Sequence, residues 1–303
     1  MFADRMHPDE VEIDVTLVAR LLAAQFPHWK DLPIKPLPSA GTDNALYRLG
    51  EDKVVRLPRI LAAAGHVDKE HEWLPRFAPL LPIAIPVPIA KGTPAESYPW
   101  HWSVYRWLEG DTATIAQIAD PRRAATQLGE FVTAMQQIDP AGGPPPGEHN
   151  SFRGVALSSR DASTRDAITA LSNTQDAGAM TAAWEAALRA PAWQGRAVWI
   201  HGDLHAANLL AQLGRLSAVI DFGCMGVGDP ACDVMVAWTY LSAETRGAFR
   251  AALQVDDATW ARGRGWALSF GLIALPYYQT TNPVLAAIAS RSIEEALTDH
   301  QQG

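Results

Sequence analysis

The chain has 303 residues, of which 48% are hydrophobic and 19% are charged. This balance excludes a disordered protein and is typical of a globular enzyme with one large domain or two modest ones. The net charge of −8 argues against nucleic acid as a partner, because an acidic chain cannot neutralise phosphates in bulk.

Neither export nor membrane insertion is indicated by the sequence. The two cysteines, Cys224 and Cys232, form no disulfide framework and no Cys-x-x-Cys motif, which favours a reducing compartment. Residues 1–14 contain acids and a proline and lack the basic-then-apolar build of a signal peptide. No apolar run is long enough to span a bilayer. We therefore expect a cytoplasmic protein without a membrane partner, whose oligomeric state the sequence leaves open.

The first third of the chain predicts a small antiparallel sheet with helices. Apolar residues at helical spacing predict helices over residues 11–26 and 62–77. The expected strands, bounded by glycine-rich or proline-rich turns, cover residues 34–37, 45–49, 54–57 and 101–107. Two hairpins in succession therefore begin the sheet.

After a break at Glu109-Gly110-Asp111, helices dominate the pattern. The expected helices cover residues 122–138, 160–190 and most of 231–300, with short strands at 198–201, 208–212 and 216–220. The glycines and prolines of residues 142–147 exclude a helix and predict an exposed loop. The sequence thus predicts an α+β protein of two lobes, a sheet-containing lobe of residues 1–107 and a larger, mainly helical lobe of residues 108–303.

Three polar side chains in the second lobe point to phosphoryl transfer. Asp203 follows an apolar strand, where its carboxylate can orient a substrate hydroxyl or accept its proton. Asn208 and Asp221 stand at the two ends of a predicted hairpin, so we expect them to lie close together. Amide and carboxylate oxygens suit Mg²⁺, which takes few protein ligands together with waters and phosphate oxygens. These residues predict an enzyme that uses a nucleoside triphosphate.

A hydrolase with a transition metal is an alternative interpretation of the same stretch. His201, Asp203 and His205 stand at alternate positions and could bind such a metal, although the other histidines form no second cluster. The sequence contains no G-x-S-x-G elbow, Walker A loop or His-Glu-x-x-His motif. Gly226-Val227-Gly228 opens a formal dinucleotide fingerprint, but no βαβ unit surrounds it.

The run from His201 to Asn208, with Ile220-Asp221-Phe222-Gly223 and Gly228-Asp229-Pro230, closely resembles the aminoglycoside phosphotransferase family. The resemblance covers nearly the whole chain and implies a protein-kinase-like fold. It implies that Asp203 is the catalytic base, that Asn208 and Asp221 hold magnesium, and that ATP or GTP is the phosphoryl donor. The acceptor it implies is a hydroxyl of a small molecule, with aminoglycoside or macrolide antibiotics, and hence antibiotic resistance, among the possibilities.

The same resemblance extends into the first lobe. Arg56 lies where the family carries a phosphate-contacting lysine, and Glu70 matches the glutamate that pairs with it. Arginine keeps the positive charge, but its planar fork does not replace an ammonium group. A non-catalytic nucleotide-binding protein with this fold is therefore the second hypothesis. The other nucleotide contacts that the resemblance implies, from the loop over the phosphates and from the hinge, are Ser39, Gly41, Arg106 and Leu108.

Overall fold

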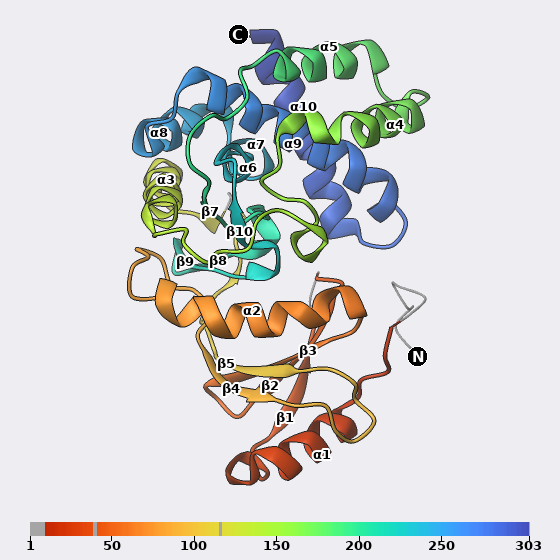
Figure 1. Cartoon of the computed structure of the whole chain (residues 1–303), viewed down its shortest axis with the longest axis vertical. Coiled ribbons are helices and arrows are strands. Elements are labelled where there is room, and N and C mark those ends of the chain that lie inside the picture. The colour runs from red at the N-terminus through yellow and green to blue at the C-terminus, as the bar shows by residue number, and fades with distance from the viewer. Residues whose placement is uncertain (1–9, 39–40, 115–116, 303) are drawn as a thin grey trace. The chain divides into compact units, whose positions relative to one another are not determined.

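The computed structural model describes residues 10–38, 41–114 and 117–302, and its elements are labelled in Figure 1. The chain divides into two compact units. The first ends at Glu109 and excludes Leu80–Ile83, which belong to the second unit with the chain from Gly110 onward. The assignment of a nucleotide-binding role to residues 1–107 and of catalysis to residues 108–303 stays a prediction. Within the described ranges, no helix is both long enough and apolar enough to cross a membrane.

The first unit contains a five-stranded antiparallel sheet with the strand order β1-β2-β3-β5-β4. Its strands are β1 (Ile34–Leu37), β2 (Asn44–Leu49), β3 (Lys53–Pro58), β4 (Pro88–Gly92) and β5 (Trp102–Arg106). Along β2, buried and half-buried residues alternate, as expected of a strand with one face on a core. The sequence missed β4, because Pro88 and the prolines before it lower strand propensity; here the strand occupies a sheet edge, where proline is tolerated.

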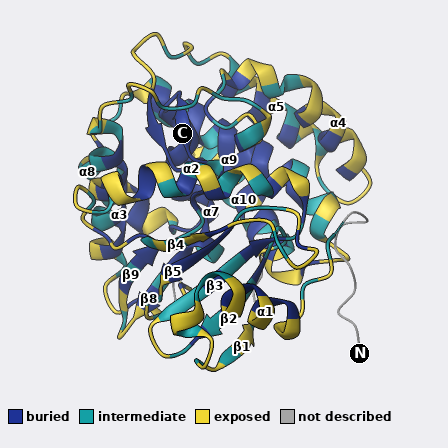
Figure 2. Cartoon of the chain, turned by 60° about the horizontal axis from the view of Figure 1, so that its bottom comes forward, coloured by how far each residue is buried: buried dark blue, intermediate teal, exposed yellow. Residues whose placement is uncertain are grey.

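Two helices accompany this sheet. Helix α1 (Val15–Gln25) begins one turn after the predicted start, because the Asp14 carboxylate accepts the Leu17 N–H at 2.7 Å and caps it there. The helix buries Leu17, Val18, Leu21 and Leu22 in a core shared with the sheet. Helix α2 (Leu61–Phe77) is banded with buried and exposed residues in Figure 2, and its buried face includes Glu70. A separate set of polar side chains, Asp203, Asn208 and Asp221, belongs to the second unit.

The strands of the second unit are short and form two small sheets. Strands β6 (Asp111–Thr112), β8 (Leu209–Gln212) and β9 (Arg215–Val219) make one sheet, and β7 (Val198–Ile200) pairs with β10 (Gly226–Gly228) in the other. The predicted hairpin is confirmed. Its turn residues Leu213 and Gly214 have φ values of 51° and 76°, which suit the right-handed twist of two paired strands.

The second unit otherwise consists of helices. These are α3 (Pro121–Gln137), α4 (Asp161–Leu171), α5 (Ala177–Leu188), α6 (Ala231–Val234), α7 (Val236–Thr239), α8 (Ala243–Leu253), α9 (Asp257–Tyr278) and α10 (Pro283–Gln302). The single helix predicted over residues 160–190 is wrong, because Asp176 caps a new helix by accepting the Ala179 N–H at 3.0 Å. Helix α9 is buried along most of its length and forms the centre of the unit.

The loop over residues 142–147 also departs from the prediction. It is not helical, as expected, but it is only partly exposed. The Val227 N–H of β10 donates to the Pro144 carbonyl at 2.9 Å, so the loop packs beside that strand. A proline cannot donate along a strand, but its carbonyl can accept, and this is the group used here. The loop leads directly into a turn at residues 150–154.

Candidate active site

The catalytic loop predicted after β7 is held by one buried carboxylate. The Asp233 oxygens accept the backbone N–H groups of His201 at 2.7 Å and of Gly202 at 2.8 Å. Gly202 has a φ of 83°, and a Cβ there would lie 2.5 Å from the Cys224 carbonyl oxygen, so only glycine fits. Burial raises the pKa of Asp233 to about 7, because the surrounding protein penalises the charged form. These contacts orient the loop that carries Asp203.

His201 is part of the scaffold of this loop. Its Nδ1 accepts the Asp203 N–H at 3.2 Å, and its Nε2 lies 3.0 Å from the Ile220 carbonyl, to which it donates in the matching tautomer. Burial lowers the pKa of His201 to about 4, so the ring is neutral. With both nitrogens engaged, His201 has none left to bind a metal. The described part of the chain contains no group of three or more His, Cys, Asp or Glu residues that could hold a metal ion.

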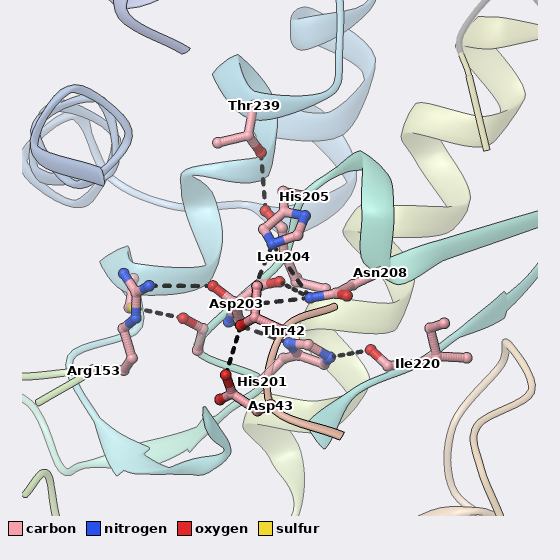
Figure 3. A network of polar contacts seen from close by, with 12 residues as sticks. Thr42, Asp43, Arg153, His201, Asp203, Leu204, His205, Asn208, Ile220 and Thr239 are labelled. Carbon is pink, nitrogen blue, oxygen red and sulfur yellow. Dashed lines mark hydrogen bonds and ion pairs between the residues drawn. The ribbon is translucent and has the colours of Figure 1, made fainter. Parts of the chain in front are cut away.

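Asp203 lies at the centre of a polar network (Figure 3). One oxygen, Oδ1, is 3.2 Å from Arg153 Nη2, and the other, Oδ2, is 3.2 Å from Asn208 Nδ2 and 3.3 Å from His205 Nε2. Burial by itself would raise the pKa of Asp203, but His205 and Arg153 more than offset it and hold that pKa well below its ordinary value. The side chain is 22% exposed, so an ionised carboxylate remains accessible.

Asn208 and Asp221 come together at the base of the hairpin, as their spacing predicted. The Ile220 N–H, next to Asp221, donates to the Asn208 carbonyl at 2.9 Å. The Asn208 amide nitrogen donates both to the Asp203 backbone oxygen at 2.9 Å and to its side chain, which directs the amide oxygen away from Asp203. Asp221 has a left-handed backbone with φ 64°. The Asp221 carboxylate and the Asn208 amide oxygen, which points away from Asp203, form a set of oxygen ligands that fits Mg²⁺.

In the first unit, Arg56 and Glu70 form the ion pair that the resemblance implied. Arg56 Nη1 lies 2.7 Å from Glu70 Oε1, and the two side chains are 12% and 2% exposed. The Tyr105 hydroxyl donates to the other Glu70 oxygen. With its amide oxygen turned toward Arg56, Asn44 accepts from Nε at 3.2 Å and from Nη2 at 3.0 Å. Three of the five guanidinium N–H bonds take part in these contacts.

The other predicted nucleotide contacts that the structure describes lie before β2 and at the end of β5. Ser39 lies outside the described residues, and Gly41 is exposed at the start of the turn before β2. Arg106 ends β5 with an exposed side chain and donates its N–H to the Val87 carbonyl at 3.1 Å. Leu108 follows, half-buried.

Comparison with known protein families shows which family the chain belongs to. A model of the phosphotransferase enzyme family matches residues 34–266, which is most of the chain. The chain belongs to this family. Its members transfer a phosphoryl group to a hydroxyl of a small molecule, so the predicted enzyme class is confirmed together with the family. Among curated proteins, none matches this phosphotransferase in sequence.

Solved structures with similar folds cover nearly the whole phosphotransferase chain. The GDP and kanamycin complex of APH(2")-IIia is 20% identical over 94% of this chain and 99% of its own, with a TM-score of 0.72. The GDP complex of wild-type aminoglycoside 2'-phosphotransferase-IIIa is 18% identical over 95% and 100%, with a TM-score of 0.69. The macrolide 2'-phosphotransferase MphH from Brachybacterium faecium is 23% identical over 92% and 98%, with a TM-score of 0.59. These likenesses confirm the predicted kinase-like fold.

Sequence reasoning missed two residues that the phosphotransferase uses to build this site. Arg153 contacts Asp203 from a loop fifty residues earlier, where no motif marks it. Thr239, at the end of α7, donates its hydroxyl to the Leu204 carbonyl at 2.9 Å and ties down the loop after Asp203. A single sequence carries no signal for either residue, because each acts through a contact made only in the folded chain.

Proposed function

We propose that the protein moves the γ-phosphoryl group of ATP or GTP to a hydroxyl group of a small molecule with the help of Mg²⁺. The observation that carries the proposal is geometric. The accessible carboxylate of Asp203 is fixed by Asn208, and the hairpin brings Asn208 beside Asp221. A hydroxyl-orienting group therefore adjoins a pair of oxygen ligands, which is the arrangement that phosphoryl transfer needs.

Asp203 directs the acceptor in this proposal. The hydroxyl oxygen forms a bond to the γ-phosphorus while the bond from that phosphorus to the bridging oxygen breaks, which releases the nucleoside diphosphate. The hydroxyl proton passes to Asp203 and from there to solvent. Because the pKa of Asp203 is well below its ordinary value, the carboxylate is a weak base, and its main contribution is to orient the hydroxyl for in-line attack.

Asn208 and Asp221 are the proposed magnesium ligands. The Asn208 amide nitrogen is occupied by Asp203, so its oxygen is the atom left to bind a hard cation. Asp221 adds a carboxylate from the other end of the hairpin. Bound there, Mg²⁺ supplies neutralising charge for the phosphate oxygens. Two protein ligands are few, but Mg²⁺ keeps several waters and completes its shell with phosphate oxygens.

The first unit supplies the proposed nucleotide contacts. Arg56, steadied by Glu70, contributes its positive charge to phosphate binding, and Ser39 and Gly41 are further proposed phosphate contacts. The hinge around Arg106 and Leu108 contacts the base through its backbone. Other members of this fold were solved with GDP and kanamycin and with ATP and streptomycin, which supports a purine nucleotide as the donor. We place the protein in the cytoplasm, where both nucleotides are available.

The test is a nucleotide assay with the purified protein. Product formation from ATP and from GTP is measured with and without Mg²⁺ over a panel of amino sugars, macrolides, hydroxy acids and simple alcohols. The proposal expects Mg²⁺-dependent formation of a phosphorylated acceptor and of nucleoside diphosphate in equal amounts. Tight nucleotide binding with no turnover under any condition would instead establish a non-catalytic nucleotide-binding protein. Transfer that proceeds unchanged in a chelator would remove the role of Asn208 and Asp221.

A further inference from the structure

Two positively charged side chains, Arg153 beside Asp203 and Arg160 near Arg153, lie outside the sequence motif of residues 201–208. Arg153 contacts one oxygen of Asp203 at 3.2 Å, and Arg160 follows seven residues later. The charge of Arg153 reaches Arg160, and burial together with this repulsion lowers the pKa of Arg160 to about 10. Keeping two cations close together and largely out of water costs free energy, so the arrangement calls for an explanation.

A strained turn holds Arg153 in its place. Ser151 and Phe152 both have left-handed backbones, with φ values of 52° and 55°, and Gly154 has a φ of 84°. The Asn150 side chain donates to the Arg153 carbonyl at 3.1 Å and so closes the turn. A Cβ at Gly154 would lie 2.7 Å from the Ile200 side chain in β7, so the turn packs tightly against that strand. Such strain persists only where the surroundings over-determine it, and it gathers at functional sites.

Arg160 is held just as firmly but is not neutralised. Its Nε donates to the Ser269 hydroxyl at 2.9 Å, and its guanidinium stacks over the Trp266 ring with 4.7 Å to the centroid. Thr164, which lies 2.8 Å from the same hydroxyl, completes the support. No carboxylate in the described chain pairs with Arg160 within 4 Å. The two terminal nitrogens of Arg160 are left to bind something else.

The carboxylate next to Arg160 in the chain and two other carboxylates of the second unit are already engaged. Asp161 accepts a tryptophan N–H at 2.7 Å and an arginine Nε at 2.8 Å. Asp229 pairs with Arg262 at 2.9 Å, both side chains being almost fully buried. Asp233 accepts the backbone N–H groups of the catalytic loop. Arg153 is paired with Asp203, whereas Arg160 is paired with none of these carboxylates.

The positive charge also lies on a defined side of Asp203. Arg153 contacts Oδ1, whereas Asn208 contacts Oδ2, and Figure 3 shows the two side chains on opposite sides of the carboxylate. The proposed metal and phosphates belong on the Asn208 side. Arg153, with the aromatic ring of Phe270 at 5.6 Å from its guanidinium carbon, therefore borders the side from which an acceptor approaches. Arg160 lies close enough to Arg153 to feel its charge, and a cation without a carboxylate partner near that side favours an anionic acceptor.

We propose that the acceptor carries an anionic group, a carboxylate or a phosphate, which Arg160 binds while Asp203 directs the hydroxyl and Arg153 fixes Asp203 between them. This inference rests on the proposed function and narrows its acceptor. A terminal guanidinium binds either group with two parallel N–H bonds. Polycationic acceptors meet an arginine where they need a carboxylate, so aminoglycosides are poor substrates for this protein.

Matched acceptors test the charge preference. Glucuronate, glucose and glucosamine form one set, γ-hydroxybutyrate, butanediol and aminobutanol form a second, and glucose 6-phosphate and kanamycin are added. Phosphorylated product is followed with ATP and with GTP, and calorimetry measures the binding of each compound without turnover. In at least one set, we expect kcat/KM and affinity for the anionic member to exceed those of the neutral and cationic members. A preference for glucuronate over glucose 6-phosphate, or the reverse, identifies the anion.

Two arginine variants separate recognition from folding. Arg160→Met is compared with Arg165→Met, whose side chain is 43% exposed and paired with Asp161 on α4. For Arg160→Met, the ratio of kcat/KM for the anionic to the neutral acceptor should fall by about tenfold to a hundredfold, the range for one lost charged hydrogen-bond pair. Arg165→Met should leave this ratio unchanged. A structural role for Arg160 would lower both rates together and leave the ratio intact, which overturns the proposal.

The outcomes also distinguish this inference from the proposed function. Efficient transfer to glucosamine, aminobutanol or kanamycin, with weaker transfer to the anions, would refute the proposal of an anionic acceptor. It would still support the proposed phosphotransferase mechanism. Equal affinity for all members of both sets, including no measurable affinity for any, also counts against the inference. Absence of all Mg²⁺-dependent turnover together with preferential, Arg160-dependent binding of the anions supports the subsite and refutes the proposed reaction.

Discussion

Two arginine-carboxylate pairs in this protein have similar chemistry and opposite settings. In the first unit, Arg56 and Glu70 lie 2.7 Å apart, and Glu70 is 2% exposed. In the second unit, Arg153 and Asp203 lie 3.2 Å apart, and Asp203 is 22% exposed. Among the residues that the structure describes, Glu70 receives the Tyr105 hydroxyl besides its arginine, whereas Asp203 also receives an amide and an imidazole.

The difference indicates what each pair is for. The Glu70 carboxylate is closed off, so its charge serves to hold Arg56 in place. Asp203 keeps an accessible surface while three donors fix its direction, so its charge remains available to an incoming hydroxyl. We therefore expect loss of the first pair to appear mainly as lost stability and loss of the second mainly as lost turnover.

Removing the charge of Asp203 is expected to have the largest effect. Asp203→Asn keeps the shape of the side chain but cannot accept the hydroxyl proton, so kcat should fall by about 10²–10⁴-fold. The measurement is the initial rate at saturating nucleotide and acceptor. Asp166→Asn, an exposed aspartate on α4, is the matched control and should keep full activity. An Asp203→Asn enzyme as active as this control would end the assignment of Asp203.

Breaking the first pair should instead destabilise the protein. Arg56→Met leaves the buried Glu70 carboxylate without its cation, and the free energy of unfolding should drop by about 3–5 kcal/mol. Urea unfolding followed by tryptophan fluorescence measures the loss. The double variant Arg56→Met with Glu70→Gln should recover most of it, since no uncompensated charge is then buried. If the double variant were no more stable than the single one, charge burial would not be the cause.

A third variant tests the ligand set in the second unit. Asp221→Asn retains a residue that tolerates the left-handed backbone of φ 64° while removing the carboxylate. We expect the Mg²⁺ concentration for half-maximal rate to rise by about 10–100-fold. The rate is measured over a Mg²⁺ titration at fixed nucleotide. An unchanged titration would show that Asp221 does not bind the metal, and would leave Asp203 without its neighbouring metal site.

The sequence predicted these two regions to different depths. The spacing of Asp203, Asn208 and Asp221 predicted a loop after a strand and the two ends of a hairpin, because these are local structures with local signals. The Arg56–Glu70 pair followed from resemblance, and the structure brings the two side chains together across fourteen residues. Features that depend on local sequence or on the family motif could therefore be predicted.

Other parts depend on contacts between distant segments. Arg160 meets Ser269 across 109 positions, and Arg153 reaches Asp203 only because the turn at Asn150–Gly154 adopts left-handed backbone angles at residues that rarely take them. Neither feature has a propensity signal. The break between α4 and α5 was missed for another reason, since residues 172–176 contain no glycine or proline to mark it.

The smallest expected effect concerns pH, and it involves the scaffold beneath Asp203. Burial lowers the pKa of His201 from 6.5 to about 4. Below pH 6.5, His201 binds a proton in the unfolded chain but stays neutral in the folded protein. Its contribution to stability is therefore full above pH 6.5 and is lost as pH falls toward about 4. Burial raises the pKa of Asp233 from 3.8 to about 7, which has the opposite sign: its contribution is full below pH 3.8 and is lost as pH rises toward about 7.

The two groups thus oppose each other over the same interval, and a variant separates them. Asp233→Asn removes the acid, so relative to wild type its free energy of unfolding should fall more steeply as pH drops from 6.5 to about 4. Urea unfolding in metal-free buffer at several pH values gives this difference directly. His201→Gln should show the reverse slope. If both variants followed the wild-type pH dependence, neither group would change its protonation on folding. The hypothesis that a neutral His201 holds the Asp203 loop would then be wrong.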